Sequence, residues 1–147
     1  TQAVPTPQPG TLPAREPLAQ TIDADGVLAQ LGNAARLMVD ARAPERYRGE
    51  VEPLDPVAGH IPGAVNRPFQ QNLRPDGRFK PAEVLRQEFS ALLAGRAPAA
   101  VINQCGSGVS ACHNLFAMEL AGMAGSRLYA GSWSEWIADP SRPIERG

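Results

Sequence analysis

The chain of 147 residues is poor in the side chains that build metal centres and disulfide frameworks. It has two cysteines and two histidines, and Cys105 and Cys112 do not stand in paired ligand spacings. We therefore predict neither a metal site nor another cofactor. Both cysteines lie in one short segment, and a helix after Cys105 would point their side chains apart. The sequence alone leaves a disulfide open, but we expect two reduced thiols and a cytoplasmic protein.

The sequence also lacks excess charge and long apolar runs. The net charge is −1, with 20% charged and 43% hydrophobic residues. This balance gives no field that would attract nucleic acid or a membrane surface. No apolar run approaches the roughly 20 residues of a transmembrane helix, and residues 1–10 lack the basic and apolar regions of a signal peptide. We predict one soluble domain with neither a nucleic-acid nor a membrane partner.

Proline is concentrated near the N-terminus. Residues 4–17 contain few large apolar groups and five prolines: Pro5, Pro7, Pro9, Pro13 and Pro17. Such a segment is extended and cannot bury enough surface to fold by itself. We predict an interdomain linker over residues 1–18 and a folded domain over residues 19–147. A linker in this place indicates a piece of a longer protein.

Apolar and amphipathic segments alternate along the rest of the chain. We expect strands at 37–39, 64–65, 99–103 and 127–129, and helices at 23–32, 44–48, 109–123 and 132–137, with a further helix opening at Pro81. The expected core positions of the two longer helices are Val84, Leu85, Phe89, Leu92, Leu93, Leu115, Met118 and Leu120. Strands that alternate with helices predict an α/β domain with a mostly parallel sheet flanked by helices.

Cys105 follows the apolar strand expected at 99–103 and precedes a helix. Ligands of parallel α/β sheets bind beyond the carboxyl ends of the strands. Gly106 and Gly108 let the backbone bend so that successive N–H groups converge, and the helix adds the positive end of its dipole. Both effects favour a thiolate or a persulfide anion at Cys105. Most lone cysteines are core thiols, and we keep that interpretation for Cys112.

Four motifs resemble those of a known family. Residues 105–112 (CGSGVSAC) resemble the active-site loop of 3-mercaptopyruvate sulfurtransferases, which belong to the rhodanese family and usually have threonine at the position of Ser110. The other three follow the family's order: Asp40-Ala41-Arg42 with Arg46, Gly59-His60-Ile61-Pro62-Gly63-Ala64, and Gly131-Ser132-Trp133-Ser134-Glu135-Trp136. The chain thus resembles the C-terminal catalytic domain of a bacterial tandem sulfurtransferase.

The resemblance implies a three-layer rhodanese fold and a ping-pong reaction through a persulfide on Cys105. Arg46 would bind the carboxylate of the donor, for which a guanidinium fork suits well. Ser107 would bond the donor carbonyl or relay a proton, and the loop residues Gly106, Gly108, Val109 and Ser110 would complete the substrate site. The implied acceptors are cyanide, a small thiol or thioredoxin. An N-terminal rhodanese domain of the same protein would close the cleft.

Structural roles are expected for the other marked residues. Asp40 and Arg42 would pair to brace a loop, and His60 would make a structural hydrogen bond in its turn. His113 would be solvated or packed on its helix. The tryptophans Trp133 and Trp136 would lie in the core or in an interface near the site.

Three alternatives to mercaptopyruvate transfer stay open. The first is thiosulfate as the donor. Leu54 stands where animal and enteric members of the family have a second substrate arginine, which puts the binding of mercaptopyruvate in question. Against thiosulfate, Gly106 and Ser107 lack the cations that thiosulfate-preferring rhodaneses tend to have. The second is a rhodanese-fold phosphatase, which needs a loop one residue longer that ends in arginine. The third is a non-catalytic interaction module.

Overall fold

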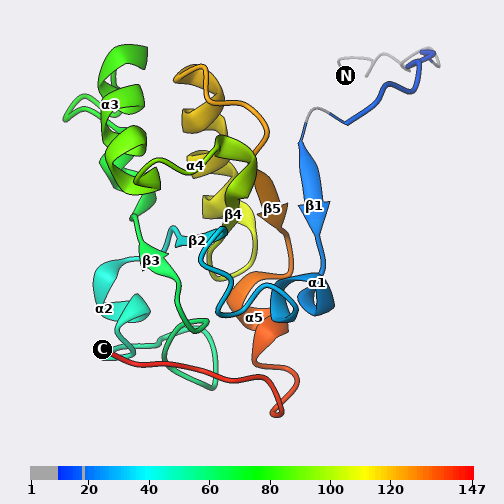
Figure 1. The fold of residues 1–147 in the computed structure, drawn as a ribbon, viewed down its shortest axis with the longest axis vertical. Coiled ribbons are helices and arrows are strands. Elements are labelled where there is room, and N and C mark those ends of the chain that lie inside the picture. The colour runs from blue at the N-terminus through cyan, green and yellow to red at the C-terminus, as the bar shows by residue number, and fades with distance from the viewer. Residues whose placement is uncertain (1–9, 18) are drawn as a thin grey trace, which may run out of the picture.

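The computed structural model describes residues 10–17 and 19–147 and is built on one parallel sheet (Figure 1). The strands are β1 (Gln20–Ile22), β2 (Leu37–Asp40), β3 (Val65–Asn66), β4 (Val101–Gln104) and β5 (Arg127–Tyr129). Their order is β1-β5-β4-β2-β3, and every neighbouring pair is parallel. The predicted α/β class is therefore confirmed.

Helices cover both faces of the sheet, which confirms the predicted layers. Helices α1 (Ala24–Leu28) and α5 (Ser132–Trp136) pack on one face, and α3 (Ala82–Leu93) and α4 (Val109–Leu120) pack on the other. The connections hold α2 (Pro44–Tyr47) and the 3₁₀ helices η1 (Phe69–Asn72) and η2 (Pro98–Ala100). None of the helices within the described ranges is long and apolar enough to cross a membrane.

The N-terminal elements differ from the expectation. The predicted linker lies partly outside the described residues, because the structure does not describe 1–9 and 18; residues 10–17 are exposed and belong to no helix or strand. Strand β1 was not predicted, since its three residues are mostly polar and pair only at the sheet edge, with β5. Asp23 does cap a helix, by accepting from Gly26 N at 2.8 Å. That helix ends at Leu28 rather than residue 32.

The long helices agree better, but not all of their expected core positions are buried. Leu85, Phe89, Leu93 and Met118 are buried. In contrast, Val84 and Leu120 are 37% and 41% exposed. Helix α4 ends at Leu120, two residues before Gly122 turns the chain with a φ of +68°. Met123 N then bonds Met118 O at 2.9 Å and closes the helix, three residues before the predicted end.

The strand register places the end of β4 beside the end of β2. Asp40, the last residue of β2, pairs with Gln104, the last residue of β4. Strand β4 begins at Val101 rather than residue 99, because 98–100 form η2. Cys105 and the segment after Asp40 therefore leave the sheet side by side at its carboxyl edge.

Candidate active site

An open pocket of about 420 Å³ lies at this carboxyl edge. Its lining residues are Ala41, Arg42, Ala43, Arg46, Leu54, Asp55, Phe69, Gln70, Cys105, Gly106, Ser107, Ser110 and Ser134. Cys105 is 2% exposed and packs near Ala41, Ala111 and Phe69. The thiol is therefore at a recessed position of the wall and not on the open surface.

Helix α5 holds the carbonyl groups of the Cys105 loop. Trp133 N donates to Cys105 O at 3.0 Å, and Ser134 N donates to Gly106 O at 2.9 Å. Cys105 N itself donates to Ser132 Oγ at 3.1 Å. By contrast, the N–H groups of residues 106–110 have no acceptor within the described residues. The loop thus offers a run of amide donors at the start of α4, a common arrangement for binding an anion.

Two backbone conformations fix this loop. Gly108 has a φ of +85°, and a Cβ there would stand 2.5 Å from Ala130 O, so only glycine fits. Ser132 has a φ of +54°, which is unfavourable for a residue with a side chain. Its hydroxyl bridges Cys105 N and Tyr129 O, to which it donates at 2.9 Å. The loop and α5 are therefore positioned together.

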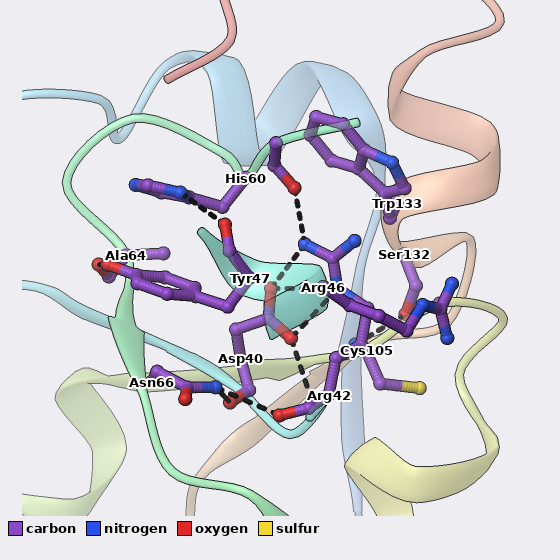
Figure 2. A network of polar contacts seen from close by, with 12 residues as sticks. Asp40, Arg42, Arg46, Tyr47, His60, Ala64, Asn66, Cys105, Ser132 and Trp133 are labelled. Atoms are coloured by element: carbon purple, nitrogen blue, oxygen red, sulfur yellow. Dashed lines mark hydrogen bonds and ion pairs between the residues drawn. The ribbon is translucent and has the colours of Figure 1, made fainter. Parts of the chain in front are cut away.

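Arg42, which lines the pocket, forms a buried ion pair with Asp40 (Figure 2). Arg42 Nη2 lies 2.7 Å from Asp40 Oδ2 and also donates to Gly59 O at 2.7 Å. Both side chains are at most 1% exposed, and the guanidinium lies over the Trp133 ring, 4.9 Å from its centroid. The pair ties β2 to the Gly59–Ala64 turn and to α5.

Arg46 reaches the pocket from α2, but its charge is shared. Its Nη2 donates to Glu52 Oε1 at 2.6 Å and to Asp55 Oδ2 at 3.4 Å. Its Nη1 has no acceptor among the described residues, and it lies 3.6 Å from where a Cβ of Gly106 would be. Burial alone would raise the pKa of Glu52, but hydrogen bonds from Arg46 and from the amides of Leu54 and Asp55 hold it below its ordinary value.

The remaining marked residues lie around the pocket and not in its lining. His60 Nδ1 is 2.8 Å from Tyr47 O, and its ring stacks on Tyr47 at 3.9 Å. Trp133 is buried and donates from Nε1 to Val57 O at 2.8 Å. Val109 is 76% exposed and is not among the residues that line the pocket.

Two residues of α4 differ from each other in surroundings. Cys112 is an exposed free thiol, so the prediction of a core residue was wrong; it lies one turn after Gly108 and donates to Gly108 O at 3.3 Å. His113 is packed between Phe69 and Phe79, at centroid distances of 5.2 and 4.5 Å. Burial lowers the pKa of His113 below its ordinary value.

The structure therefore brings together Cys105, Gly106, Ser107, Ser110 and Arg46 in one wall. Sequence reasoning missed Glu52 and Asp55, which bind Arg46, and Ser132 and Ser134, which hold the loop. The serines belong to a motif that was recognised, so their hydroxyls could have been found there. No local pattern marks the carboxylates. Within residues 10–17 and 19–147, no group of three or more His, Cys, Asp or Glu side chains could hold a metal ion.

Curated proteins of related sequence cover most of this chain. A probable 3-mercaptopyruvate sulfurtransferase of Pseudomonas aeruginosa is 56% identical over 140 residues, which cover 95% of this chain and 49% of that protein. The thiosulfate sulfurtransferase of Mus musculus is 36% identical over 146 residues, 96% of this chain and 49% of that protein. The chain thus spans about half the length of these curated relatives.

Solved structures share the fold. The crystal structure of Tum1 from Saccharomyces cerevisiae has a TM-score of 0.73 and 32% identity, over 86% of this chain and 46% of that one. EanB, solved as a cysteine persulfide with ergothioneine, also has a TM-score of 0.73, with 25% identity over 86% of this chain and 32% of that one. The family described as the Rhodanese-like domain matches residues 23–139. The chain therefore belongs to the family of rhodanese-like domains.

Proposed function

We propose that this chain is the catalytic domain of a sulfurtransferase that carries sulfur as a persulfide on Cys105. In the first step the Cys105 thiolate attacks the thiol sulfur of 3-mercaptopyruvate. The carbon–sulfur bond breaks, its electron pair goes to the pyruvate enolate, and the thiol proton moves to that carbon to give pyruvate. The Cys105 persulfide anion then passes its outer sulfur to cyanide, giving thiocyanate, or to a thiolate, giving a persulfide, and the Cys105 thiolate returns.

The observation that carries this proposal is the environment of Cys105. The residue lies in the pocket wall at the carboxyl end of β4, where it is only 2% exposed. The amide N–H groups of residues 106–110 are without acceptors in the described part of the chain, while the carbonyls of Cys105 and Gly106 are held by α5. Amide donors of this kind would stabilise the negative charge of a thiolate or a persulfide.

Donor choice is the finer part of the proposal. The relatives are named for both 3-mercaptopyruvate and thiosulfate, and we propose 3-mercaptopyruvate as the preferred donor. Gly106 and Ser107 carry no charge, and the Arg46 guanidinium lies beside Gly106, with Nη2 and Nη1 at 3.5 and 3.6 Å from where a Cβ of Gly106 would be. One guanidinium is suited to one carboxylate. Leu54, which lines the pocket and is 77% exposed, adds no second cation. Ser107 would bond the donor carbonyl.

The surroundings of the domain complete the proposal. The chain spans about half of its relatives, and we propose that residues 1–18 link the domain over 19–147 to an N-terminal rhodanese domain that closes the pocket. Both cysteines are free thiols, which supports work in a reducing compartment such as the cytoplasm. Thioredoxin or a small thiol would be the acceptor there.

The test is the mass of the intact protein after incubation with 3-mercaptopyruvate and removal of the donor. The expected result is the gain of one sulfur atom, and its loss when cyanide is added. Cys105→Ser should take up none and should lose transfer from every donor, with an unchanged circular dichroism spectrum. Cys112→Ser is the matched control, because this exposed thiol lies on α4, the helix that follows the Cys105 loop, and it should behave like the wild type. Sulfur uptake by the Cys105→Ser protein would contradict the assignment.

A further inference from the structure

Two carboxylates already bind the Nε and Nη2 donors of Arg46, the arginine that we propose to bind the sulfur donor. Arg46 Nε lies 3.1 and 3.2 Å from the two oxygens of Glu52, and Nη2 lies 2.6 Å from Glu52 Oε1 and 3.4 Å from Asp55 Oδ2. The side chains of Arg46, Glu52 and Asp55 are 17%, 3% and 12% exposed. An incoming anion therefore meets an ion pair and not a free cation.

Glu52 and Asp55 differ in how firmly they hold Arg46. Glu52 is turned into the protein, where it also accepts from the amides of Leu54 and Asp55 at 3.2 and 3.3 Å and from Arg42 Nη1 at 3.4 Å. Asp55 lines the pocket, and its single contact with Arg46 is long, at 3.4 Å. An anionic donor that enters the pocket therefore competes with Asp55 and leaves Glu52 in place.

Asp55 is fixed in the wall of the pocket by its second oxygen. The Ser134 hydroxyl lies 2.8 Å from Asp55 Oδ1 and 2.9 Å from Gly106 O, next to Cys105 in the chain. Ser134 and Asp55 thus join the loop after α2 to the Cys105 loop. The Asp55 charge cannot simply swing out into solvent while this contact persists, so a donor bound near Arg46 and Cys105 experiences it.

The charges at this end of the pocket sum to less than zero. Arg42, Arg46 and Asp55 line it, and Asp40 and Glu52 are bonded directly to the two arginines. Two arginines against three carboxylates leave one net negative charge, and the Cys105 thiolate of the proposed reaction adds another. Because the Coulomb energy between fixed charges is proportional to the charge of the ligand, a dianion is disfavoured about twice as much as a monoanion.

We propose that Asp55 determines the charge selectivity of the pocket: it competes with the donor for Arg46 and selects monoanionic α-keto acids, such as 3-mercaptopyruvate, over the thiosulfate dianion. This inference rests on the sulfurtransferase function proposed above. It assigns to Asp55 a role in specificity and not in the chemical step, since the sulfur is transferred at Cys105.

Asp55→Asn tests the inference, because asparagine has the same shape and keeps an oxygen that can accept from Ser134. We expect kcat/KM for 3-mercaptopyruvate to rise about threefold, and kcat/KM for thiosulfate to rise by about the square of that factor, roughly tenfold. The preference for 3-mercaptopyruvate over thiosulfate should therefore shrink about threefold. A rise of the same size for both donors, or a fall for both, would overturn the charge argument.

Two further variants test the position of this charge. Ser134→Ala removes the hydroxyl that holds Asp55 in the wall of the pocket, so the preference for 3-mercaptopyruvate over thiosulfate should shrink in the same direction as in Asp55→Asn, by a smaller factor. Glu119→Gln removes one exposed negative charge near the carboxyl end of α4, far from the loop at the other end of that helix. It should leave the ratio of the two donors as in the wild type. A change of the ratio in Glu119→Gln would assign the effect to net charge and would refute Asp55 as its source.

The same proteins should be titrated by calorimetry with pyruvate, a monoanion, and sulfate, a dianion, neither of which carries transferable sulfur. Asp55→Asn should tighten sulfate binding by about the square of the factor found for pyruvate. This measurement separates the two proposals. If the wild type transfers no sulfur from either donor, the proposed function fails, and the anion titrations still decide on Asp55. If transfer occurs and the two anions respond equally, the inference about Asp55 fails alone.

Discussion

Arg42 and Arg46 stand in the same connection between β2 and β3, yet the fold uses their guanidinium groups in different ways. The side chain of Arg42 is 1% exposed, and its N–H groups donate hydrogen bonds to Asp40, Glu52 and Gly59 O. The side chain of Arg46 is 17% exposed and keeps Nη1 without an acceptor in the described part of the chain. Arg42 therefore stabilises the fold, and Arg46 keeps part of its guanidinium available for a ligand.

The difference comes from their surroundings and not from residue type. Arg42 follows the end of β2, so it is covered by α5 and by the Gly59–Ala64 turn. Arg46 lies on α2, which opens with Pro44 and brings the side chain over Gly106. Glu52 bonds both arginines, at 3.4 Å from Arg42 and 2.6 Å from Arg46. The buried pair of Asp40 and Arg42 therefore helps to hold Glu52, and Glu52 in turn positions Arg46.

The largest effect on this comparison is expected from Arg42→Met. It leaves Asp40, whose side chain is fully buried, without its cation. Removing one partner of a buried ion pair costs about 3–5 kcal/mol of the free energy of unfolding. Asp40→Asn together with Arg42→Met should recover part of this loss, because no unpaired charge remains. Urea unfolding of the wild type, both single variants and the double variant measures it as a double-mutant cycle.

The exposed pair of Arg74 and Asp76 provides the control. Its side chains are 44% and 51% exposed and 3.6 Å apart, so Arg74→Met should change the free energy of unfolding by less than about 1 kcal/mol. If Arg42→Met costs no more than Arg74→Met, the buried pair does not brace the pocket, and the contrast between Arg42 and Arg46 is lost.

A smaller effect, mainly on activity, is expected from Arg46→Ala. A charge-assisted hydrogen bond is worth roughly 1.5–3 kcal/mol, so kcat/KM for 3-mercaptopyruvate should fall about tenfold or more. Arg46→Lys should lie between the wild type and alanine, because one ammonium group cannot serve Glu52 and a donor with the geometry of the fork. Steady-state kinetics with cyanide as acceptor measures both. Arg48→Ala removes an arginine from the same segment that pairs with Glu50 and should leave kcat/KM unchanged.

The outcome for Arg46 decides how the pocket binds its donor. A value of kcat/KM within twofold of the wild type in Arg46→Ala would mean that the loop amides alone bind the donor, as they bind the sulfur. It would also remove the reason for Asp55 to select between donors, because Asp55 acts on the donor beside Arg46.

The fold could be read from the sequence where the signal is local and repeated. Strands β2 and β4 are buried and begin with short apolar runs, β5 is half-buried with Leu128 and Tyr129, and α3 shows one apolar face, so their places were predicted to within a few residues. Strand β1 has no such signal, because its residues are mostly exposed and its formation depends on pairing with β5 about a hundred residues later in the chain. An edge strand of three mostly polar residues is defined by its neighbour and not by its own pattern.

The candidate site was predictable in its centre and not at its rim. Cys105 and the glycines of its loop follow from the end of β4, and Arg46 follows from the family resemblance. Glu52 and Asp55 lie in a proline-rich loop whose path depends on distant contacts, such as Trp133 Nε1 with Val57 O at 2.8 Å and Ser134 Oγ with Asp55 at 2.8 Å. No spacing in the sequence indicates that these carboxylates meet Arg46. The competition for Arg46 could be found only from the structure.

A third arginine extends the comparison to the other face of the sheet. Arg67 is 6% exposed, and its guanidinium lies over the Phe89 ring, 4.1 Å from the centroid. It donates to Asn72 Oδ1 at 3.0 Å and to Glu88 Oε2 at 2.7 Å. Because Arg67 fixes the carbonyl oxygen of Asn72, the amide nitrogen of Asn72 must face His113 Nδ1, which is 3.2 Å away. His113 Nδ1 can therefore accept this hydrogen bond only when it carries no proton.

The smallest expected effect concerns the protonation of His113. The same Asn72 amide also donates to Asn114 Oδ1 at 2.6 Å, so a proton on His113 Nδ1 would face an N–H group that cannot turn away. Burial between Phe69 and Phe79 acts in the same direction and lowers the pKa of His113. Between this lowered pKa and the ordinary value of about 6.5, the unfolded chain binds more protons than the folded one. The free energy of unfolding should therefore decrease as the pH falls below about 6.5, by no more than about 1.4 kcal/mol per pH unit for this one group.

The variant His113→Phe keeps an aromatic ring beside Phe79 and does not titrate. Urea unfolding of the wild type and the variant is measured from about pH 7.5 to about pH 5, and the difference between their free energies of unfolding separates the histidine from the carboxylates. Nuclear magnetic resonance titration of the His113 ring gives its pKa directly. A pKa of His113 at or above the ordinary value would contradict this prediction, and so would parallel pH profiles for the two proteins. Either result would mean that the Asn72 amide is free to turn and that Arg67 does not fix it against α4.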